Sequence, residues 1–177
     1  MATDTFIGLL QGQCDAQLEA IEKFKTYSIQ ELQAPSSTGG WSVLQCVEHL
    51  NLYYAFYLPE LERSIKKLKS GDTFHSGWLG NYLAENILPK PGMRTMRTFR
   101  SKDPAPSEVD VIVLERFAMH VKHMRALVEK LRSKDPGSAR CKTTLGSWIS
   151  IRVGDTFRFV LNHNQRHLEQ AMRNVVW

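Results

Sequence analysis

Apolar residues recur at intervals of three or four positions in four separate stretches of the chain, the spacing of one buried helix face. The first stretch covers residues 4–33 and stops at the run APSSTGG, which is rich in helix-breaking residues. The second starts at Ser42, which forms a capping-box pattern with Gln45, and continues to Gly71. Because Pro59 lies inside this second stretch, we expect it to interrupt and kink the helix.

The other two helical stretches lie in the second half of the chain. The third begins near Ser107, with Asp110 three residues later, and stops at the turn-forming run SKDPGS. The fourth follows Gly154, with Asp155 as its expected N-cap, and continues to about Asn174. These boundaries predict one long connection, between the second and third helices, and short ones elsewhere.

The segments between the helices complete the predicted fold class. Residues 71–107 are rich in Gly and Pro and predict a long crossover, with a short helical piece around Trp78, Tyr82 and Ile87. The run CKTTLGSWISIR predicts a loop, and no part of the chain alternates cleanly with period two. We therefore predict an all-α protein, a four-helix bundle, over a single domain of residues 1–177.

Composition narrows the class of protein. With 177 residues, 42% of them hydrophobic, the chain can bury a core without disulfides. It has neither an apolar run of membrane-spanning length nor a signal-peptide pattern, so we expect a cytoplasmic protein without membrane contact. Cys14, Cys46 and Cys141 are widely spaced and form no CxxC pair, which fits a reducing compartment. The net charge of +5 is modest, and no nucleic-acid partner is expected.

Three histidines are candidate metal ligands. His163 and His167 lie four residues apart on the last helix, so their side chains emerge on one face, and His49 in the second helix could supply a third imidazole. Three imidazoles favour zinc, nickel, copper or iron over magnesium or calcium and leave a coordination position open. The spacing alone leaves open that these histidines merely pack. For His120 and His123 we favour a structural or surface position over metal ligation.

The same helix argues against one class of metalloenzyme. Zincin peptidases carry the pattern H-E-x-x-H, in which the glutamate acts as the general base. Here the residue after His163 is Asn164. The sequence therefore disfavours peptidase activity.

Two long segments resemble one family. The chain is similar to the DinB/YfiT-like superfamily in the stretches GGWSVLQCVEHLNLYYAFYLPELERSIKK and ISIRVGDTFRFVLNHNQRHLEQAMRNV, and more loosely elsewhere. The resemblance implies an up-down-down-up four-helix bundle with a long crossover between helices two and three, in a protein that is often a homodimer. It also implies a divalent metal, of which we expect zinc or nickel, held by His49, His163 and His167.

The resemblance also suggests reactions. Superfamily members include S-transferases that use bacillithiol or mycothiol, so we predict a metal-dependent transferase that activates a low-molecular-weight thiol and acts on a small-molecule substrate. The alternatives are a metal-dependent hydrolase and a non-catalytic metal-binding stress-response module. Hydrolysis needs a general base, and Glu48 and Glu169 point away from the histidine faces.

Further pocket candidates are weaker. Tyr53 and Cys46 lie about one turn from His49 on a similar face, although a buried tyrosine and a core cysteine are the simpler interpretation. Arg94, Arg97 and Arg100 in the crossover could contact carboxylates of the thiol, although a solvated charged loop explains them equally simply.

Overall fold

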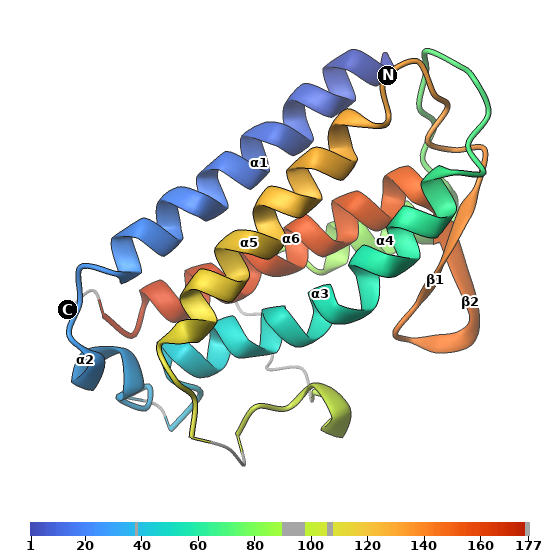
Figure 1. Cartoon of the computed structure of the whole chain (residues 1–177). Helices are drawn as coiled ribbons and strands as arrows, with labels where there is room; N and C mark the ends of the chain where they lie inside the picture. The colour runs from blue at the N-terminus through green and yellow to red at the C-terminus, as the bar shows by residue number, and fades with distance from the viewer. Residues whose placement is uncertain (38, 90–97, 106–107, 176–177) are drawn as a thin grey trace.

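The protein is mostly helical (Figure 1). The computed structural model describes residues 1–37, 39–89, 98–105 and 108–175. None of the helices in these residues is long and apolar enough to cross a bilayer. The elements of the described residues are α1 (Thr3–Phe24), α2 (Ile29–Gln33), α3 (Val43–Ile65), α4 (Trp78–Asn86), the short 3₁₀ helix η1 (Arg100–Lys102), α5 (Ile112–Glu129), β1 (Arg140–Thr143), β2 (Gly146–Arg152) and α6 (Val153–Met172).

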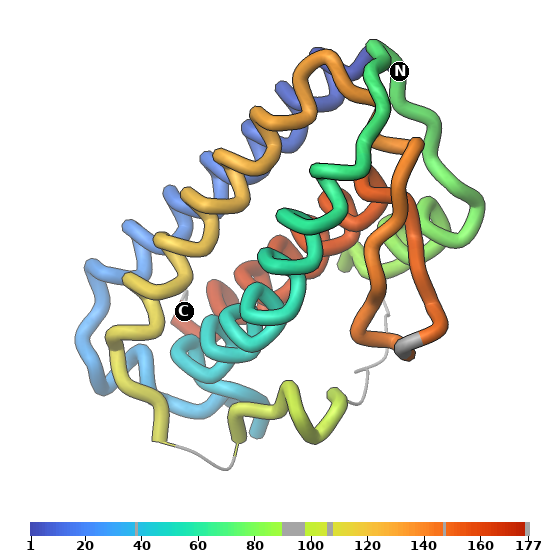
Figure 2. The backbone as a smooth tube through the Cα atoms, turned by 45° about the vertical axis from the view of Figure 1, so that its right-hand side comes forward, coloured from blue at the N-terminus to red at the C-terminus, as the bar shows by residue number. Residues whose placement is uncertain are grey.

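Four long helices enclose the hydrophobic core. In two views α1 lies beside α5, and α3 lies beside α6 (Figures 1 and 2). Helix α3 also packs against α5, α1 also packs against α6, and the short α4 covers part of α6. Each long helix turns one apolar stripe inward and contributes a fully buried aromatic ring, as amphipathic helices do in bundles. These rings belong to Phe24, Tyr54, Phe117 and Phe157.

The first predicted helix is broken in two. Helix α1 ends at Phe24, and α2 begins at Ile29 with a capping box of its own. The Ser28 hydroxyl accepts a hydrogen bond from the Glu31 amide, and the Glu31 carboxylate accepts one from the Ser28 amide. This reciprocal pair stabilises a new helix start, so the predicted single helix over residues 4–33 is wrong.

The second predicted helix starts where its capping box indicated. The Gln45 amide donates to the Ser42 hydroxyl at 3.2 Å, and the Ser42 amide donates to the Gln45 side chain at 3.0 Å. Helix α3 then continues through Pro59 to Ile65, so the predicted interruption at Pro59 is wrong. Pro59 has no amide hydrogen to donate to the carbonyl of Ala55, one turn earlier in the helix. Because Ala55 is exposed, water can bind that carbonyl instead, and the helix continues.

The third predicted helix starts later than the sequence suggested. Helix α5 begins at Ile112, whose amide donates to the Asp110 carboxylate at 2.8 Å. The predicted start, Ser107, lies outside the described residues. Asp110 therefore closes a turn just before the helix.

The segment predicted as a loop before the last helix forms a β-hairpin. Strands β1 and β2 pair antiparallel, with Cys141 opposite Ile151, and both of these side chains are buried. The register shifts between Lys142 and Thr143. Strand β1 alternates exposed and buried side chains over only four residues, which is too short for a period of two to stand out in the sequence. The fold is thus a helical bundle with one hairpin rather than purely α-helical.

Asp155 has a different role from the predicted N-cap. Helix α6 already begins at Val153, and Asp155 is fully buried inside its first turn. Its carboxylate accepts hydrogen bonds from the Ser76 hydroxyl and, at 2.8 Å, from the Gly77 amide, which is the N-cap residue of α4. The buried carboxylate therefore caps α4 from the neighbouring helix and holds the two helices together.

The close contact between α4 and α6 gives a stability prediction. A Cβ atom at Gly80 would lie 2.4 Å from the Asp155 carboxylate oxygen, so Gly80→Ala is expected to lower the free energy of unfolding by about 1–3 kcal/mol. The matched control is Gly12→Ala on the exposed face of α1, where a Cβ meets nothing within 4 Å. That change is expected to raise the free energy of unfolding by up to about 1 kcal/mol. Urea unfolding of both variants tests this, and equal stability of Gly80→Ala and wild type would contradict the packing described.

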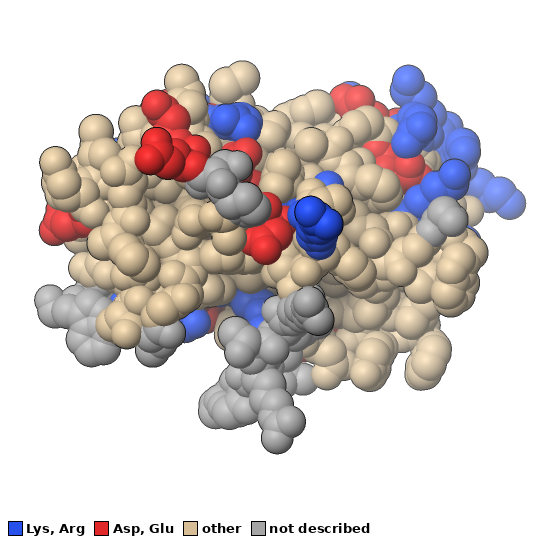
Figure 3. All heavy atoms as spheres, turned by 90° about the horizontal axis from the view of Figure 1, so that it is seen from below, with Lys and Arg blue, Asp and Glu red and all other residues tan. Residues whose placement is uncertain are grey.

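Charges of both signs occur on the surface. In the view from below, Asp and Glu lie among neutral residues, and Lys and Arg gather at one edge (Figure 3). Several charged side chains form ion pairs between helices, such as Arg125 with Asp15 and Lys25 with Glu115. These pairs lie at the surface, and each contributes little to stability.

Candidate metal centre

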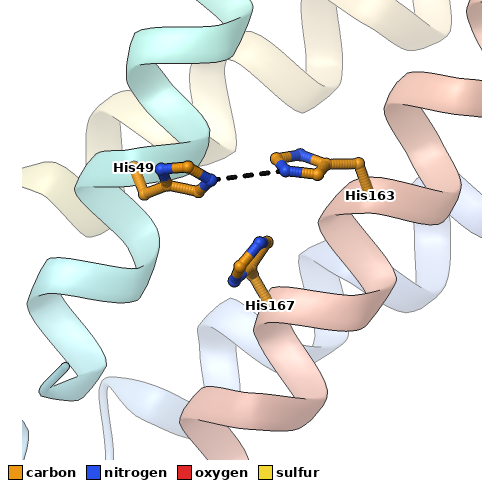
Figure 4. Close-up of side chains that lie close together, drawn as sticks. All are labelled: His49, His163 and His167. Carbon is orange, nitrogen blue, oxygen red and sulfur yellow. Dashed lines mark hydrogen bonds between the residues drawn. The ribbon is translucent and has the colours of Figure 1, made fainter. Parts of the chain in front are cut away.

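The structure brings the three candidate histidines together. His49 projects from α3 toward His163 and His167 on α6 (Figure 4). One ring nitrogen from each lies within 4.8 Å of the other two. His49 and His163 are buried, at 2% and 4% exposure, and His167 is partly buried. The i, i+4 pair on α6 thus faces the third imidazole across a helix–helix contact, as ligands do in metal-binding bundles.

Hydrogen bonds fix the orientation of two of the rings. His49 Nδ1 lies 2.7 Å from the carbonyl oxygen of Lys102, and His167 Nδ1 lies 2.9 Å from the side-chain oxygen of Gln170. Because these oxygens only accept, each Nδ1 carries the proton and donates it. The Nε2 atoms of His49 and His167 consequently keep their lone pairs, which is the tautomer that a metal ligand needs.

The position of the third ring, that of His163, also fits a shared metal ion. His49 Nε2 and His163 Nε2 are 3.3 Å apart. Two nitrogens bound to one tetrahedral ion at 2.0–2.1 Å are also separated by roughly 3.3 Å. In the described part of the chain His163 Nδ1 is buried without a hydrogen-bond partner, so this ring is not held by a structural hydrogen bond on that side. Nitrogen donors so arranged fit a divalent transition-metal ion.

The electrostatics keep all three rings neutral. Burial lowers the pKa of His49 to about 4 and that of His167 to about 3. Burial also lowers the pKa of His163 well below its ordinary value, and the neighbouring imidazoles lower it further. Desolvation penalises the charged imidazolium form, so the rings are unprotonated at neutral pH. Neutral imidazole is the form that binds metal.

Aromatic rings surround the cluster. Trp41 lies 4.8 Å from the His49 ring and 5.9 Å from the His167 ring, measured between ring centroids. Tyr53 lies 4.9 Å from His49 and 4.3 Å from His163. The predicted pocket candidate Tyr53 therefore touches two of the three histidines. Burial raises the pKa of its hydroxyl, which stays protonated at neutral pH.

Cys46 is placed differently. It is fully buried in the core and does not belong to the histidine cluster. Burial raises the pKa of its thiol to about 12, so the thiolate does not form at neutral pH. The packing interpretation therefore fits Cys46 better than a role as nucleophile.

The crossover contributes a residue that sequence reasoning did not single out. Besides the Lys102 carbonyl on His49, the Lys102 ammonium donates to the Leu52 carbonyl at 2.6 Å and lies 5.7 Å from the centroid of the Tyr53 ring. A backbone carbonyl leaves no signature in a sequence, so no pattern could have indicated it. Of the predicted basic candidates, Arg100 is exposed in η1, and Arg94 and Arg97 lie outside the described residues.

The remaining histidines lie outside the cluster. His120 Nδ1 is 3.1 Å from the Asn51 side-chain oxygen, and His123 pairs with Glu62 at 2.8 Å. Both contacts link α5 to α3, and His120 is partly buried whereas His123 is exposed, which fits the structural or surface positions expected of these two residues.

The glutamates considered as general bases are engaged elsewhere. Glu48 forms an ion pair with Arg116 at 3.2 Å, and Glu169 accepts a hydrogen bond from Gln165 at 2.9 Å. Among the described residues no carboxylate oxygen joins the three histidine nitrogens as a further candidate ligand. Among these residues the cluster consists of imidazoles alone.

Comparisons with known proteins found two kinds of match. A family model described as the DinB superfamily matches residues 2–171. Among solved structures the chain is similar to YfiT from Bacillus subtilis, a probable metal-dependent hydrolase with an unusual four-helix bundle topology. The two chains are 16% identical with a TM-score of 0.54, and the match covers 97% of this chain and 85% of that one, a likeness that shows the fold alone. A comparison with curated proteins found no match. The chain belongs to the DinB superfamily.

Proposed function

We propose that the protein is a divalent-metal-dependent enzyme in which His49, His163 and His167 hold the ion. The observation that carries this proposal is the convergence of three neutral imidazoles from two facing helices. Three neutral ligands leave most of the positive charge of the ion uncompensated and leave positions free for a substrate. Zinc and nickel suit this donor set.

We further propose that a low-molecular-weight thiol of the bacillithiol type, bound as its thiolate, forms a carbon–sulfur bond to an electrophilic carbon and displaces the leaving group of that carbon, while the thiol proton passes to solvent. A divalent ion at the three histidines would lower the pKa of a bound thiol so far that the reactive thiolate forms without a general base. Among the described residues no carboxylate joins the cluster, and Glu48 and Glu169 have other partners. This favours a thiol over water as the nucleophile.

The residues around the histidines have supporting roles in this proposal. The Lys102 carbonyl holds the His49 tautomer, and the rings of Trp41 and Tyr53 exclude water from the nitrogens. The Tyr53 hydroxyl, kept protonated by burial, can donate a hydrogen bond to a bound substrate. Arg94, Arg97 and Arg100 remain candidates for binding carboxylates of the thiol.

Hydrolysis is the second candidate. It is supported by the likeness to YfiT, a probable metal-dependent hydrolase. In that case water replaces the thiol as the nucleophile, and its pKa falls toward about 7. A non-catalytic metal-binding module is the remaining alternative.

One set of assays separates these functions. Zinc-loaded protein is incubated with bacillithiol and 1-chloro-2,4-dinitrobenzene, and separately with 4-nitrophenyl acetate without thiol. We expect thiol conjugation that disappears on chelation and in the variant His163→Ala. Ester hydrolysis without thiol conjugation would support the hydrolase instead. Tight zinc binding without either reaction would favour the non-catalytic module.

The finer architecture also belongs to this proposal. We propose an up-down-down-up bundle with the long crossover between α3 and α5, which the helix directions in Figure 1 support. We also propose a small-molecule substrate, a homodimer and a cytoplasmic location, the last supported by three buried cysteines without disulfides.

A further inference from the structure

A small polar cluster lies inside the apolar core beside the histidines. The Asn164 side-chain amide in α6 donates to Gln17 Oε1 in α1 at 2.9 Å and to the Tyr54 hydroxyl in α3 at 2.7 Å. The Gln17 amide in turn donates to the Leu161 carbonyl of α6 at 3.1 Å. Asn164 and Tyr54 are fully buried and Gln17 is 4% exposed. Three helices are thereby joined at one point by directional bonds.

Stability alone does not account for this cluster. Among the described residues Asn164 Oδ1 is buried and accepts no hydrogen bond. An unsatisfied buried acceptor costs folding free energy, whereas an apolar side chain of similar size would fill the same space without that cost. The best-attested gain from such buried polar groups is a fixed register between packed elements.

The register fixed here is the one that assembles the histidine site. Asn164 lies between His163 and His167 in α6, and Tyr54 lies in α3, five residues after His49. A rotation of α6 by one residue would turn its imidazoles through 100°, away from His49. Apolar packing alone tolerates alternative arrangements of this kind, but a hydrogen-bonded amide allows few.

We propose that Asn164, together with Gln17 and Tyr54, is a positioning residue that sets the rotation and register of α6 so that its two histidines meet His49. This inference rests on the proposed metal site and names the part of the core on which its geometry depends. None of the three side chains belongs to the histidine cluster itself.

The test replaces the whole cluster by apolar residues in the variant Gln17→Leu/Tyr54→Phe/Asn164→Leu. We expect a folded protein that unfolds at or above the wild-type temperature without metal but binds zinc about 10- to 100-fold more weakly. Zinc affinity is measured by competition with a chromogenic chelator. The absorption spectrum of the Co²⁺-loaded proteins reports the coordination geometry and is expected to change.

Two further variants keep the test decisive. Gln165→Leu makes the same kind of change at the next position of α6, where the side chain is exposed and hydrogen-bonded to Glu169, and it should leave zinc affinity unchanged. Tyr54→Phe removes a single hydroxyl without changing ring volume and should weaken zinc binding about threefold or more even if the triple variant does not fold. Folded variants with wild-type affinity and cobalt spectrum would overturn the inference. A wild-type protein that binds no metal would instead refute the proposed metal site.

Discussion

Removal of one imidazole, in His163→Ala, is expected to weaken zinc binding on the order of 10²- to 10³-fold. Structural zinc sites with four ligands contribute about 10–16 kcal/mol, so a single ligand accounts for about 2.5–4 kcal/mol. Among the described residues the hydrogen-bond contact of His163 is with His49, and alanine keeps the backbone of the helix while it removes the imidazole. Wild-type protein should carry about one equivalent of zinc or nickel by plasma mass spectrometry. The variant should carry almost none, although its circular dichroism stays helical.

His123→Ala is the matched control for this experiment. His123 also belongs to a long helix and contacts a polar side chain, Glu62, but it lies outside the cluster. Its removal should leave the metal content unchanged. Full metal content in His163→Ala, or absence of metal from the wild type even after reconstitution, would contradict the site.

The histidine cluster could be predicted from the sequence because helical spacing fixes which side chains share a face. The i, i+4 relation of His163 and His167 follows from helix geometry alone. That His49 completes the cluster does not follow from spacing, since it depends on how α3 packs against α6. The sequence offered His49 as a candidate for the third ligand, the resemblance to the DinB/YfiT-like superfamily implied it, and the structure brings the three together.

Three contacts that support the fold around the site could not be predicted, each for a physical reason. Lys102 contributes a backbone carbonyl, which every residue possesses. Asp155 has the spacing of an N-cap, but the helix starts before it and its carboxylate caps α4 instead. Asn164 looked informative only as a departure from the zincin pattern, whereas its partners Gln17 and Tyr54 lie far away in the sequence.

The sequence pattern also predicted two short elements wrongly. The capping box at Ser28 ends one apparent helix and starts another, although the apolar stripe continues across the break. In residues 140–152 the strands are four and seven residues long, too short for the alternation typical of a hairpin to stand out. Both errors concern short elements whose stability comes from tertiary contacts, such as the hydrogen bond from the Lys142 amide to the Glu60 carboxylate.

Metal-free protein is expected to lose stability steadily as the pH falls from about 6.5 to about 4. The buried histidines have lowered pKa values in the folded state, whereas in the unfolded chain they bind protons near pH 6.5. In this window the unfolded state therefore binds more protons than the folded state, and acid favours unfolding. For His49, whose pKa falls to about 4, the loss is on the order of 3 kcal/mol at the acid end of the window.

Urea unfolding of metal-free protein across this pH range measures the effect, with His163→Leu as the comparison. Leucine fills the buried site without a titrating group, so the variant should show a shallower fall in stability with acid than the wild type. Zinc should steepen the fall for the wild type, because ion and protons compete for the same nitrogens. If His163→Leu and wild type gave the same slope, the acid sensitivity would arise from carboxylates in ion pairs, such as Glu129 with Arg132, and the histidine cluster would not be the titrating unit.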